Sequence, residues 1–155
     1  MPCITIPGQP YIPGIPSYVV NLVVLGWNGG ANSIAQHGED CYFKFSVDQA
    51  LIGVVAGLGP PDRTPSNFAR LTHAFQLVSA NGVLVWQIVE GGAAVGSQVV
   101  QFNAGDEFFI RRVRGIVQYF INSMDQAGLK YTSQIRSTGQ IRAGAVLYAS
   151  GDKVI

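Results

Sequence analysis

Short runs of β-branched and aromatic residues recur along this chain of 155 residues, and Gly, Asn, Asp and Pro separate them. Apolar residues at helical spacing are nearly absent. This pattern is typical of an all-β sandwich or barrel. It predicts strands at residues 18–25, 41–47, 52–58, 72–78, 83–89, 98–102, 107–113, 116–121, 129–132 and 145–149, the last of them continued by residues 153–155.

The predicted strands differ in how many of their faces are apolar. Odd-numbered residues of 41–47 are apolar, whereas Lys44 and Ser46 stand at even positions, as in a half-buried antiparallel strand. Residues 83–89 and 117–121 are apolar on both faces. We expect the core to cover one face of these strands, and a loop, the N-terminal segment or a partner chain to cover the other.

Several connections have the composition of tight turns. Asn81-Gly82 joins two strongly apolar runs, and this dipeptide readily adopts the positive φ angles of hairpin turns. Gly105 and Arg114-Gly115 predict two further tight turns. Residues 59–67 form a longer polar loop that contains three prolines, and we expect this loop to be exposed.

Charge is scarce and unevenly distributed. Only 12% of the residues are charged, the net charge is +1, and the first charged residue is Glu39. This composition is too apolar for a disordered chain and not basic enough for a nucleic-acid binder. No run of about 20 apolar residues predicts a membrane-spanning helix. A surface segment normally carries charges, so we expect residues 1–38 to be largely covered by the domain itself or by another subunit.

Five prolines lie within the first 16 residues, at positions 2, 7, 10, 13 and 16. Proline fixes φ and donates no N–H, which excludes a helix or an inner strand and favours an extended arm. We therefore divide the chain into an extended Pro/Gly-rich arm at 1–17 and a β-sandwich domain at 18–155. The sequence leaves three arrangements of this arm open: it packs on its own domain, it lies on a neighbouring subunit, or it stays free. Cys3 and Cys41 are interpreted as two reduced thiols, although they could also pair.

Two stretches resemble a known fold family. Residues 72–92 combine a strand, a glycine turn and a strand ending in Val89-Glu90-Gly91, and residues 102–122 contain Gly105-Asp106-x-Phe-x-Ile followed by Val117-x-Tyr-x-x-Asn. Together they resemble the concanavalin A-like lectin/glucanase jelly roll, including its SPRY-like relatives. Ser123 stands where that pattern has a glycine. The resemblance implies a two-sheet antiparallel β-sandwich.

A second resemblance concerns the N-terminal region. The Pro/Gly arm and residues 25–34 are similar in style to virion proteins of tailed bacteriophages, in which such jelly rolls decorate tail tips and baseplates. The resemblance implies a tail component that is made in the bacterial cytoplasm and assembled into the virion. Its partners would be other tail subunits, contacted through residues 1–38, and further copies of the chain in a homo-oligomer. A free-standing bacterial lectin-like module is the alternative.

The residues that catalysis would require are not grouped in the sequence. Glucanases of the resembled superfamily carry Glu-x-Asp-x-x-Glu on one strand, but here Glu39, Glu90 and Glu107 are widely separated. No Gly-x-Ser-x-Gly nucleophile elbow is present, and no cluster of Asp, Asn, Glu and His predicts a metal site. We therefore expect a protein that is not an enzyme and that needs no metal or cofactor.

Two groups of residues are candidates for binding a host surface polysaccharide. Trp27, Asn28 and Asn32 combine an aromatic face with amides, the usual chemistry of a sugar site. Arg111, Arg112 and Arg114 carry guanidinium groups that could bind an acidic polysaccharide or the carboxylates of a partner. Structural roles are the alternative for both groups: Trp27 closes the edge of the core, and the arginines lie at a solvated strand end.

Overall fold

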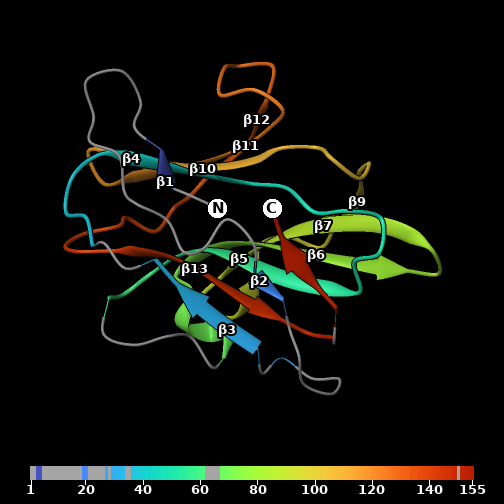
Figure 1. Ribbon diagram of the computed structural model, residues 1–155. Coiled ribbons are helices and arrows are strands. Elements are labelled where there is room, and N and C mark those ends of the chain that lie inside the picture. Colours follow the sequence, from blue (N-terminus) through green and yellow to red (C-terminus); the bar gives the residue numbers. More distant parts are fainter. Residues whose placement is uncertain are drawn as a thin grey trace.

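The strands form a two-layered sandwich in the computed structural model, which describes residues 3–4, 19–20, 27, 29–33, 36–61, 67–149 and 151–155 (Figure 1). Within this part of the chain, one layer is a five-stranded antiparallel sheet of order β1-β4-β10-β11-β12. Its strands are β1 (Cys3–Ile4), β4 (Cys41–Phe45), β10 (Phe108–Val113), β11 (Ile116–Ile121) and β12 (Leu129–Thr132).

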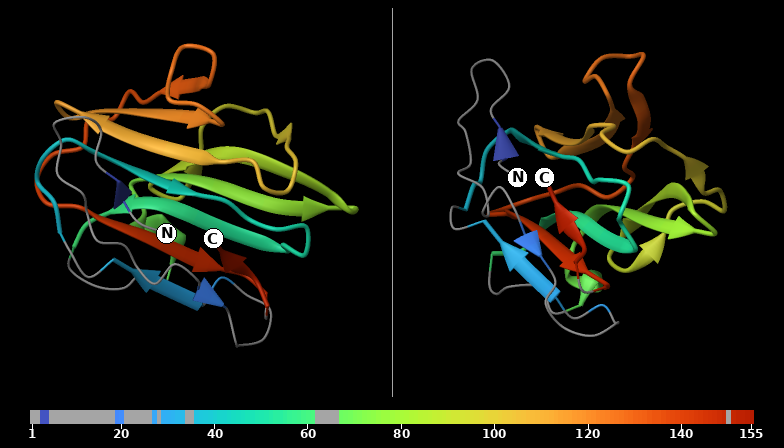
Figure 2. Two further views of the ribbon diagram at one scale, coloured as in Figure 1. Left: turned by 45° about the horizontal axis from the view of Figure 1, so that its top comes forward. Right: turned by 45° about the vertical axis from the view of Figure 1, so that its right-hand side comes forward.

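The other layer is a seven-stranded sheet of order β3-β13-β5-β6-β7-β8, counted over the described residues, with β9 also paired to β7. Its strands are β3 (Gly29–Asn32), β13 (Arg142–Leu147), β5 (Gly53–Gly59), β6 (His73–Ala80), β7 (Val83–Glu90), β8 (Ala93–Ala94) and β9 (Val100–Gln101). In Figure 2 the orange strands β10 and β11 lie above the green strands of this sheet. A short ladder joins β14 (Lys153–Val154) to β2 (Val19–Val20).

The fold class predicted from the sequence is confirmed. In the described part of the chain, a single 3-10 turn, η1 (Phe68–Arg70), accompanies the strands. The alternation predicted for residues 41–47 is also confirmed: Cys41, Phe43 and Phe45 are buried, whereas Tyr42 and Lys44 are half-buried.

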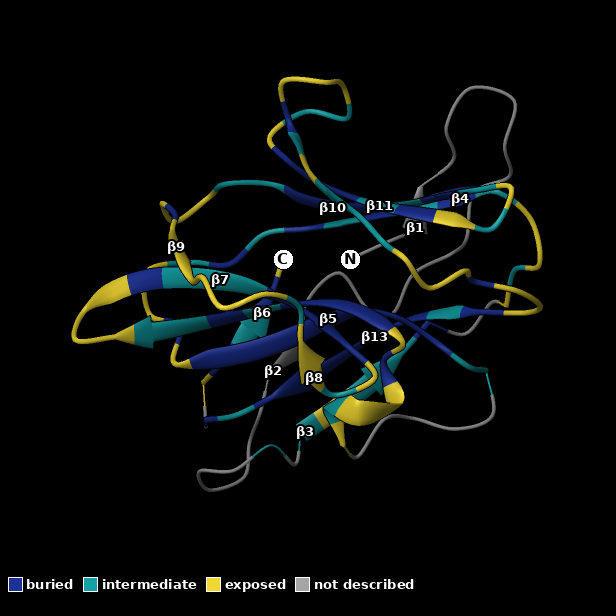
Figure 3. Cartoon of the chain, turned by 180° about the vertical axis from the view of Figure 1, so that it is seen from behind, coloured by how far each residue is buried: buried dark blue, intermediate teal, exposed yellow. Residues whose placement is uncertain are grey.

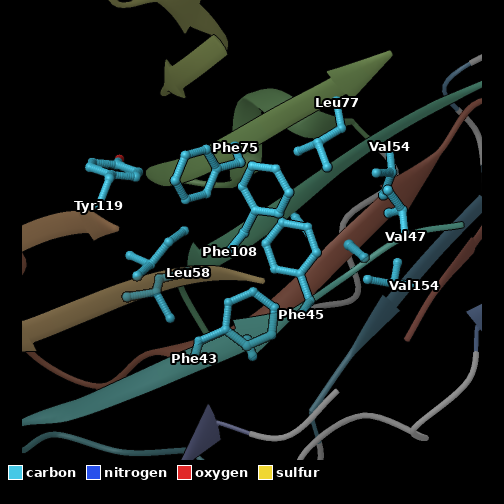
Figure 4. Close-up of a cluster of buried hydrophobic side chains, with 14 of the residues drawn as sticks. Phe43, Phe45, Val47, Val54, Leu58, Phe75, Leu77, Phe108, Tyr119 and Val154 are labelled. Atoms are coloured by element: carbon cyan, nitrogen blue, oxygen red, sulfur yellow. The ribbon is translucent and has the colours of Figure 1, made fainter. Parts of the chain in front are cut away.

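The core lies between the two sheets and is rich in aromatic rings (Figure 4). The ring of Phe108, from the five-stranded sheet, contacts Phe75 of β6 edge to face at 5.0 Å between centroids and stacks on Phe45 of β4 at 5.5 Å. Edge-to-face and offset contacts of this kind add stability beyond the apolar area they bury. These rings fix the separation of the two sheets.

Two hairpins have the turn geometry that the sequence predicts. Asn81 and Gly82 have φ angles of 52° and 79°, and Arg114 and Gly115 have φ angles of 50° and 77°. Positive φ at both central positions is the signature of a type I′ turn, whose twist matches that of the flanking strands. The hairpins β6–β7 and β10–β11 are therefore closed by the residues expected.

The end of the chain differs from the prediction. The expectation that residues 153–155 continue the last strand is wrong, because β14 pairs with β2 and lies outside the sheet that contains β13. The buried Asp152 carboxylate stabilises the turn between β13 and β14, because it accepts hydrogen bonds from the backbone N–H groups of Ala149, Ile52 and Gly53. Gly151, with φ of 92°, allows the turn.

Two residues of the predicted arm belong to a sheet. Cys3–Ile4 pairs with Tyr42 and Phe43 as the edge strand of the five-stranded sheet, a position compatible with nearby prolines. The rest of the arm lies outside the described residues, as do most of the strand predicted at 18–25 and the centre of the 59–67 loop. No helix in the described ranges is long and apolar enough to cross a membrane.

Candidate functional site

A groove of about 710 Å³ opens between the edges of the two sheets. One wall comes from β7 and the connection that carries β9, and the other comes from β11 and β12. Figure 3 shows the connection around β9 as an exposed segment beside the buried strands. We name this the interlayer groove, and its lining residues are Trp86, Ile88, Val95, Gly96, Ser97, Gln98, Val100, Gln101, Phe102, Asp106, Ile121, Lys130 and Tyr131.

A row of four aromatic rings runs beneath the groove from one sheet to the other. Trp86 of β7 meets Phe75 edge to face at 5.7 Å, Phe75 meets Tyr119 of β11 at 5.2 Å, and Tyr119 lies 5.9 Å from Tyr131 of β12. The two inner rings are fully buried, whereas Trp86 and Tyr131 are half-buried and line the groove. Packing from behind therefore holds two aromatic faces in place before any ligand arrives.

A buried carboxylate anchors the middle of this row. The Tyr119 hydroxyl donates a hydrogen bond of 2.9 Å to Glu90 Oε1. Burial, and then the adjacent Glu90 carboxylate, raise the pKa of Tyr119 far above its usual value of 10.0. The phenol therefore stays protonated and keeps donating to Glu90, which fixes the ring that supports Tyr131.

Polar side chains surround the aromatic faces. Ser97, Gln98, Gln101 and Lys130 are exposed on the walls and rim of the groove and offer hydroxyl, amide and ammonium groups. Asp106 is held more firmly, because its carboxylate accepts hydrogen bonds from Asn103 N at 2.9 Å and from Asn122 Nδ2 at 3.1 Å. Aromatic faces with hydrogen-bonding groups around them suit a ring that is apolar on its faces and polar at its edge.

No group of carboxylates gathers among the described residues that line the groove. Among the described lining residues, Asp106 is the only carboxylate in the groove. Glu107 is ion-paired with Lys44 at 2.7 Å, and Glu90 is bonded to Tyr119. Nowhere in the described ranges do three His, Cys, Asp or Glu residues gather closely enough to hold a metal ion.

The predicted group around Trp27 lies on the outer face of the seven-stranded sheet. Trp27 is half-buried against Phe68, at 5.5 Å between ring centroids, and against Tyr148, at 5.1 Å. Its neighbours include a buried cluster of Val55, Leu71, Ala74 and Val146, so it acts as a cover for the sheet. Asn32 lies on β3 opposite Gly144. Asn28 lies outside the described residues.

The predicted arginine group is split by the alternation of β10. Arg111 faces outward, and Arg114 is exposed in the following turn. Arg112 faces inward and is only 2% exposed. Its guanidinium donates to the backbone oxygens of His37, Glu39 and Gly139 and to Ser137 Oγ. The structure thus gives Arg112 an internal structural role and removes it from the surface on which it was expected.

The structure unites neither predicted group with the interlayer groove, which the sequence analysis missed. Its aromatic walls come from Trp86 and Tyr131, which are 45 positions apart and lie on different sheets. Trp86 sits inside the run 83–89, whose only polar residue is Gln87, and therefore gives only a core signal. The composition of residues 95–101, which holds Ser97, Gln98 and Gln101 between small and apolar residues, is the one local sign of a polar rim.

Comparisons with known proteins identify the fold. Neither a family model nor a curated protein matches the sequence. The crystal structure of the TRIM65 PSpry domain is similar, with a TM-score of 0.56 and 15% identity over 89% of this chain and 79% of that one. The SPRY domain of human HERC1 gives a TM-score of 0.56 and 14% identity over 84% of this chain and 82% of that one. The protein thus has the concanavalin A-like jelly-roll fold that the sequence motifs imply.

Proposed function

We propose that this protein is a non-enzymatic, lectin-like carbohydrate-binding module and that the interlayer groove holds a glycan. The observation that carries the proposal is the pair of fixed aromatic faces, Trp86 and Tyr131, beside exposed amides. Sugar rings present C–H faces that stack on aromatic side chains and hydroxyls that bond to amides and carboxylates. The groove volume lies within the usual range for small-ligand sites.

A binding role agrees better with the groove than a hydrolytic one does. Glycoside hydrolysis uses two carboxyl groups on opposite sides of the scissile bond. The described lining residues provide Asp106 alone, and two hydrogen bonds from Asn103 and Asn122 already occupy its oxygens. We therefore assign Asp106 to holding the groove wall.

The test is to titrate each member of a panel of neutral bacterial surface oligosaccharides into the protein and to measure binding by calorimetry. We expect the wild type to bind at least one glycan and Gln101→Ala to weaken that binding by about tenfold, since one good hydrogen bond is worth about 1.4 kcal/mol. Tyr131→Leu keeps most of the apolar volume but removes the flat ring, and it should weaken binding further.

The control is Gln134→Ala, which removes the same amide from an exposed position outside the groove. It should bind as the wild type does, and thermal melts should show all three variants folded. Wild-type binding that is equally strong in Gln101→Ala and Tyr131→Leu would place the glycan elsewhere. Failure of the folded wild type to bind any member of the panel would remove the lectin role.

We further propose that the module is a virion component of a tailed bacteriophage, at the tail tip or baseplate, where glycan binding would recognise the host surface. The support is in the sequence: residues 1–38 carry no Lys, Arg, Asp or Glu, and the arm has the proline content of a segment laid against a protein surface. Other tail subunits and further copies of this chain would be its partners. A free-standing bacterial lectin is the competing assignment, and the genes adjacent to this one distinguish the two.

A further inference from the structure

A second groove, of about 680 Å³, lies on the outer face of the five-stranded sheet. It follows the β10–β11 hairpin, the two orange strands of the upper layer in Figure 1. Half of its lining residues are arginines, and we name it the arginine groove. The lining residues are Arg111, Val113, Arg114, Ile116, Gln118 and Arg136.

The guanidinium of Arg111 is held in a fixed orientation at the floor of this groove. Its Cζ lies 4.7 Å from the centroid of the buried Phe120 ring, and its Nη2 donates a hydrogen bond of 2.6 Å to Gln118 Oε1. Its Nε is buried and has no hydrogen-bond partner. Stacking and a single amide thus orient the cation, but neither contact neutralises its charge.

The other two arginines of the groove, Arg114 and Arg136, meet at the turn of the hairpin. Arg136 Nη1 donates to the backbone oxygen of Arg114 at 3.1 Å, which brings both residues to one end of the groove. In the described part of the chain, no carboxylate forms an ion pair with Arg111, Arg114 or Arg136. The Asp40 carboxylate is near, but its Oδ1 accepts a hydrogen bond from the Arg114 backbone N.

We propose that the arginine groove is a second binding site, which takes an acidic polysaccharide through its carboxylate groups. Guanidinium groups bind carboxylates through two parallel N–H···O bonds, and such charge-assisted bonds are roughly twice as strong as neutral ones. Three cations gathered along one groove suit a polymer whose charges repeat. The apolar side chains of Val113 and Ile116, the latter 42% exposed, give sugar C–H faces a surface between the charges.

The site is separate from the interlayer groove, since the two share no lining residue and open on different sides of the five-stranded sheet. Binding at the arginine groove therefore does not depend on the proposed lectin function. Variants of one groove should leave the other unchanged, so that failure of one proposal is distinguishable from failure of the other.

The test is calorimetry with a galacturonate hexamer as the acidic probe and a neutral glucose hexamer of similar length as its counterpart. Arg114→Asn removes a charge while keeping a residue that tolerates the positive φ of 50° at this turn. We expect Arg114→Asn and Arg136→Gln each to weaken hexamer binding by about tenfold, the effect of one charge-assisted hydrogen bond. Raising the salt concentration should weaken wild-type binding, because exposed charges are screened.

The matched control is Arg70→Gln, which changes the net charge equally at an exposed position on η1, beside the other sheet. It should bind the acidic hexamer as the wild type does. Equal weakening in Arg70→Gln would mean non-specific attraction and would overturn the site, as would equal binding of the neutral hexamer. No binding of the galacturonate hexamer, or binding of a glutamate hexapeptide in its place, would reject a polysaccharide as the ligand.

Discussion

Arg112 is a cation that holds the interior together, although it neighbours two surface arginines in the sequence. It is 2% exposed and donates to three backbone carbonyl groups and one hydroxyl. These acceptors belong to segments around residues 37–39 and 137–139, so one side chain joins two loops to β10. Buried acceptors that lose their donor incur the full cost of desolvation.

We therefore expect Arg112→Met to lower the free energy of unfolding by about 3 kcal/mol, because it leaves several buried acceptors unpaired. Urea denaturation measures the change. Arg136→Met removes an exposed arginine and should change the free energy of unfolding by about 0.5 kcal/mol at most. If both variants unfold at the same urea concentration, the structural role given to Arg112 is wrong.

The Tyr119–Glu90 pair predicts how stability depends on alkaline pH. The folded pKa of Tyr119 lies above its usual value of 10.0, chiefly because the phenol is buried. The unfolded chain therefore loses this proton first as the pH rises. The stability that the protonated phenol contributes is complete below pH 10 and declines above it, by about 1.4 kcal/mol per pH unit.

Tyr119→Phe removes this titration, and it also removes the donor to Glu90. We expect the variant to be about 2 kcal/mol less stable than the wild type at pH 7, because the buried carboxylate loses its hydrogen bond. The difference should shrink between pH 10 and pH 11. Denaturation curves of both proteins at pH 7, 10 and 11 measure it, and a difference that stays constant would contradict the argument.

Predictions for single residues were correct where the alternation of side chains between the two faces of a strand was used, and wrong where it was not. It placed Phe43 and Phe45 in the core, and both are buried. The same rule separates Arg111 from Arg112, since consecutive strand residues point to opposite faces. Treating them as one cluster relied on their nearness in the sequence, whereas the groove gathers Arg136 from another segment.

At the scale of the elements, β5 shows how closely two strands can approach. Gly57 lies opposite Ala74 in β6, and a Cβ placed on it would lie 2.0 Å from the His73 oxygen and 2.6 Å from the Ala74 Cα. Those atoms belong to the backbone of a central strand and cannot move without disrupting the ladder. We expect Gly57→Ala to destabilise the fold by about 3 kcal/mol, at the upper end for overpacking, as measured by thermal or urea unfolding.

Gly53, on the same strand, provides the comparison. A Cβ there would lie 3.0 Å from the Trp27 ring and 3.1 Å from the Tyr148 Cβ, so mainly side chains must shift. We expect Gly53→Ala to cost about 1 kcal/mol and to alter tryptophan fluorescence, because the Trp27 ring moves. A Gly57→Ala variant as stable as Gly53→Ala would show that β5 and β6 adjust more easily than this close approach implies.

Two strands that the sequence did not predict, β3 and β8, have a shared physical reason. β3 consists of Gly29–Asn32, which includes no β-branched residue, and only its pairing with β13 makes it a strand. β8, Ala93–Ala94, likewise depends on the edge of β7. Local propensity cannot indicate a strand that is formed by its partner. Longer β-branched and aromatic runs, such as β6 and β7, need no such help and were predicted nearly to their ends.

At the scale of the whole molecule, the two grooves differ in the chemistry of the side chains that line them. The interlayer groove is aromatic and amide-rich, and the arginine groove is cationic, in a chain with only 12% charged residues. The sandwich topology explains why the sequence could not predict the first of them. Its walls come from β7 with its short partner β9 and from the edge strand β12, which meet only when the two sheets stack.

The proposed assembly through the N-terminal segment predicts the mass of the particle in solution. We expect the full-length chain to be an oligomer and a variant lacking residues 1–17 to be a monomer, as measured by size-exclusion chromatography with light scattering. The reason is that residues 1–38 carry no Lys, Arg, Asp or Glu, and an apolar segment without charges favours association with a partner.

This deletion also removes β1 and thus uncovers the edge of β4, which invites non-native strand pairing. A variant lacking only residues 1–4 uncovers the same edge but keeps the prolines at 7, 10, 13 and 16, so it is the matched control. An oligomer that survives the short deletion and dissociates on the long one would assign assembly to residues 5–17. The same oligomeric state for all three chains would exclude the arm from assembly. A full-length monomer would exclude it as well, and it would mean that the apolar residues of the arm are covered by their own domain.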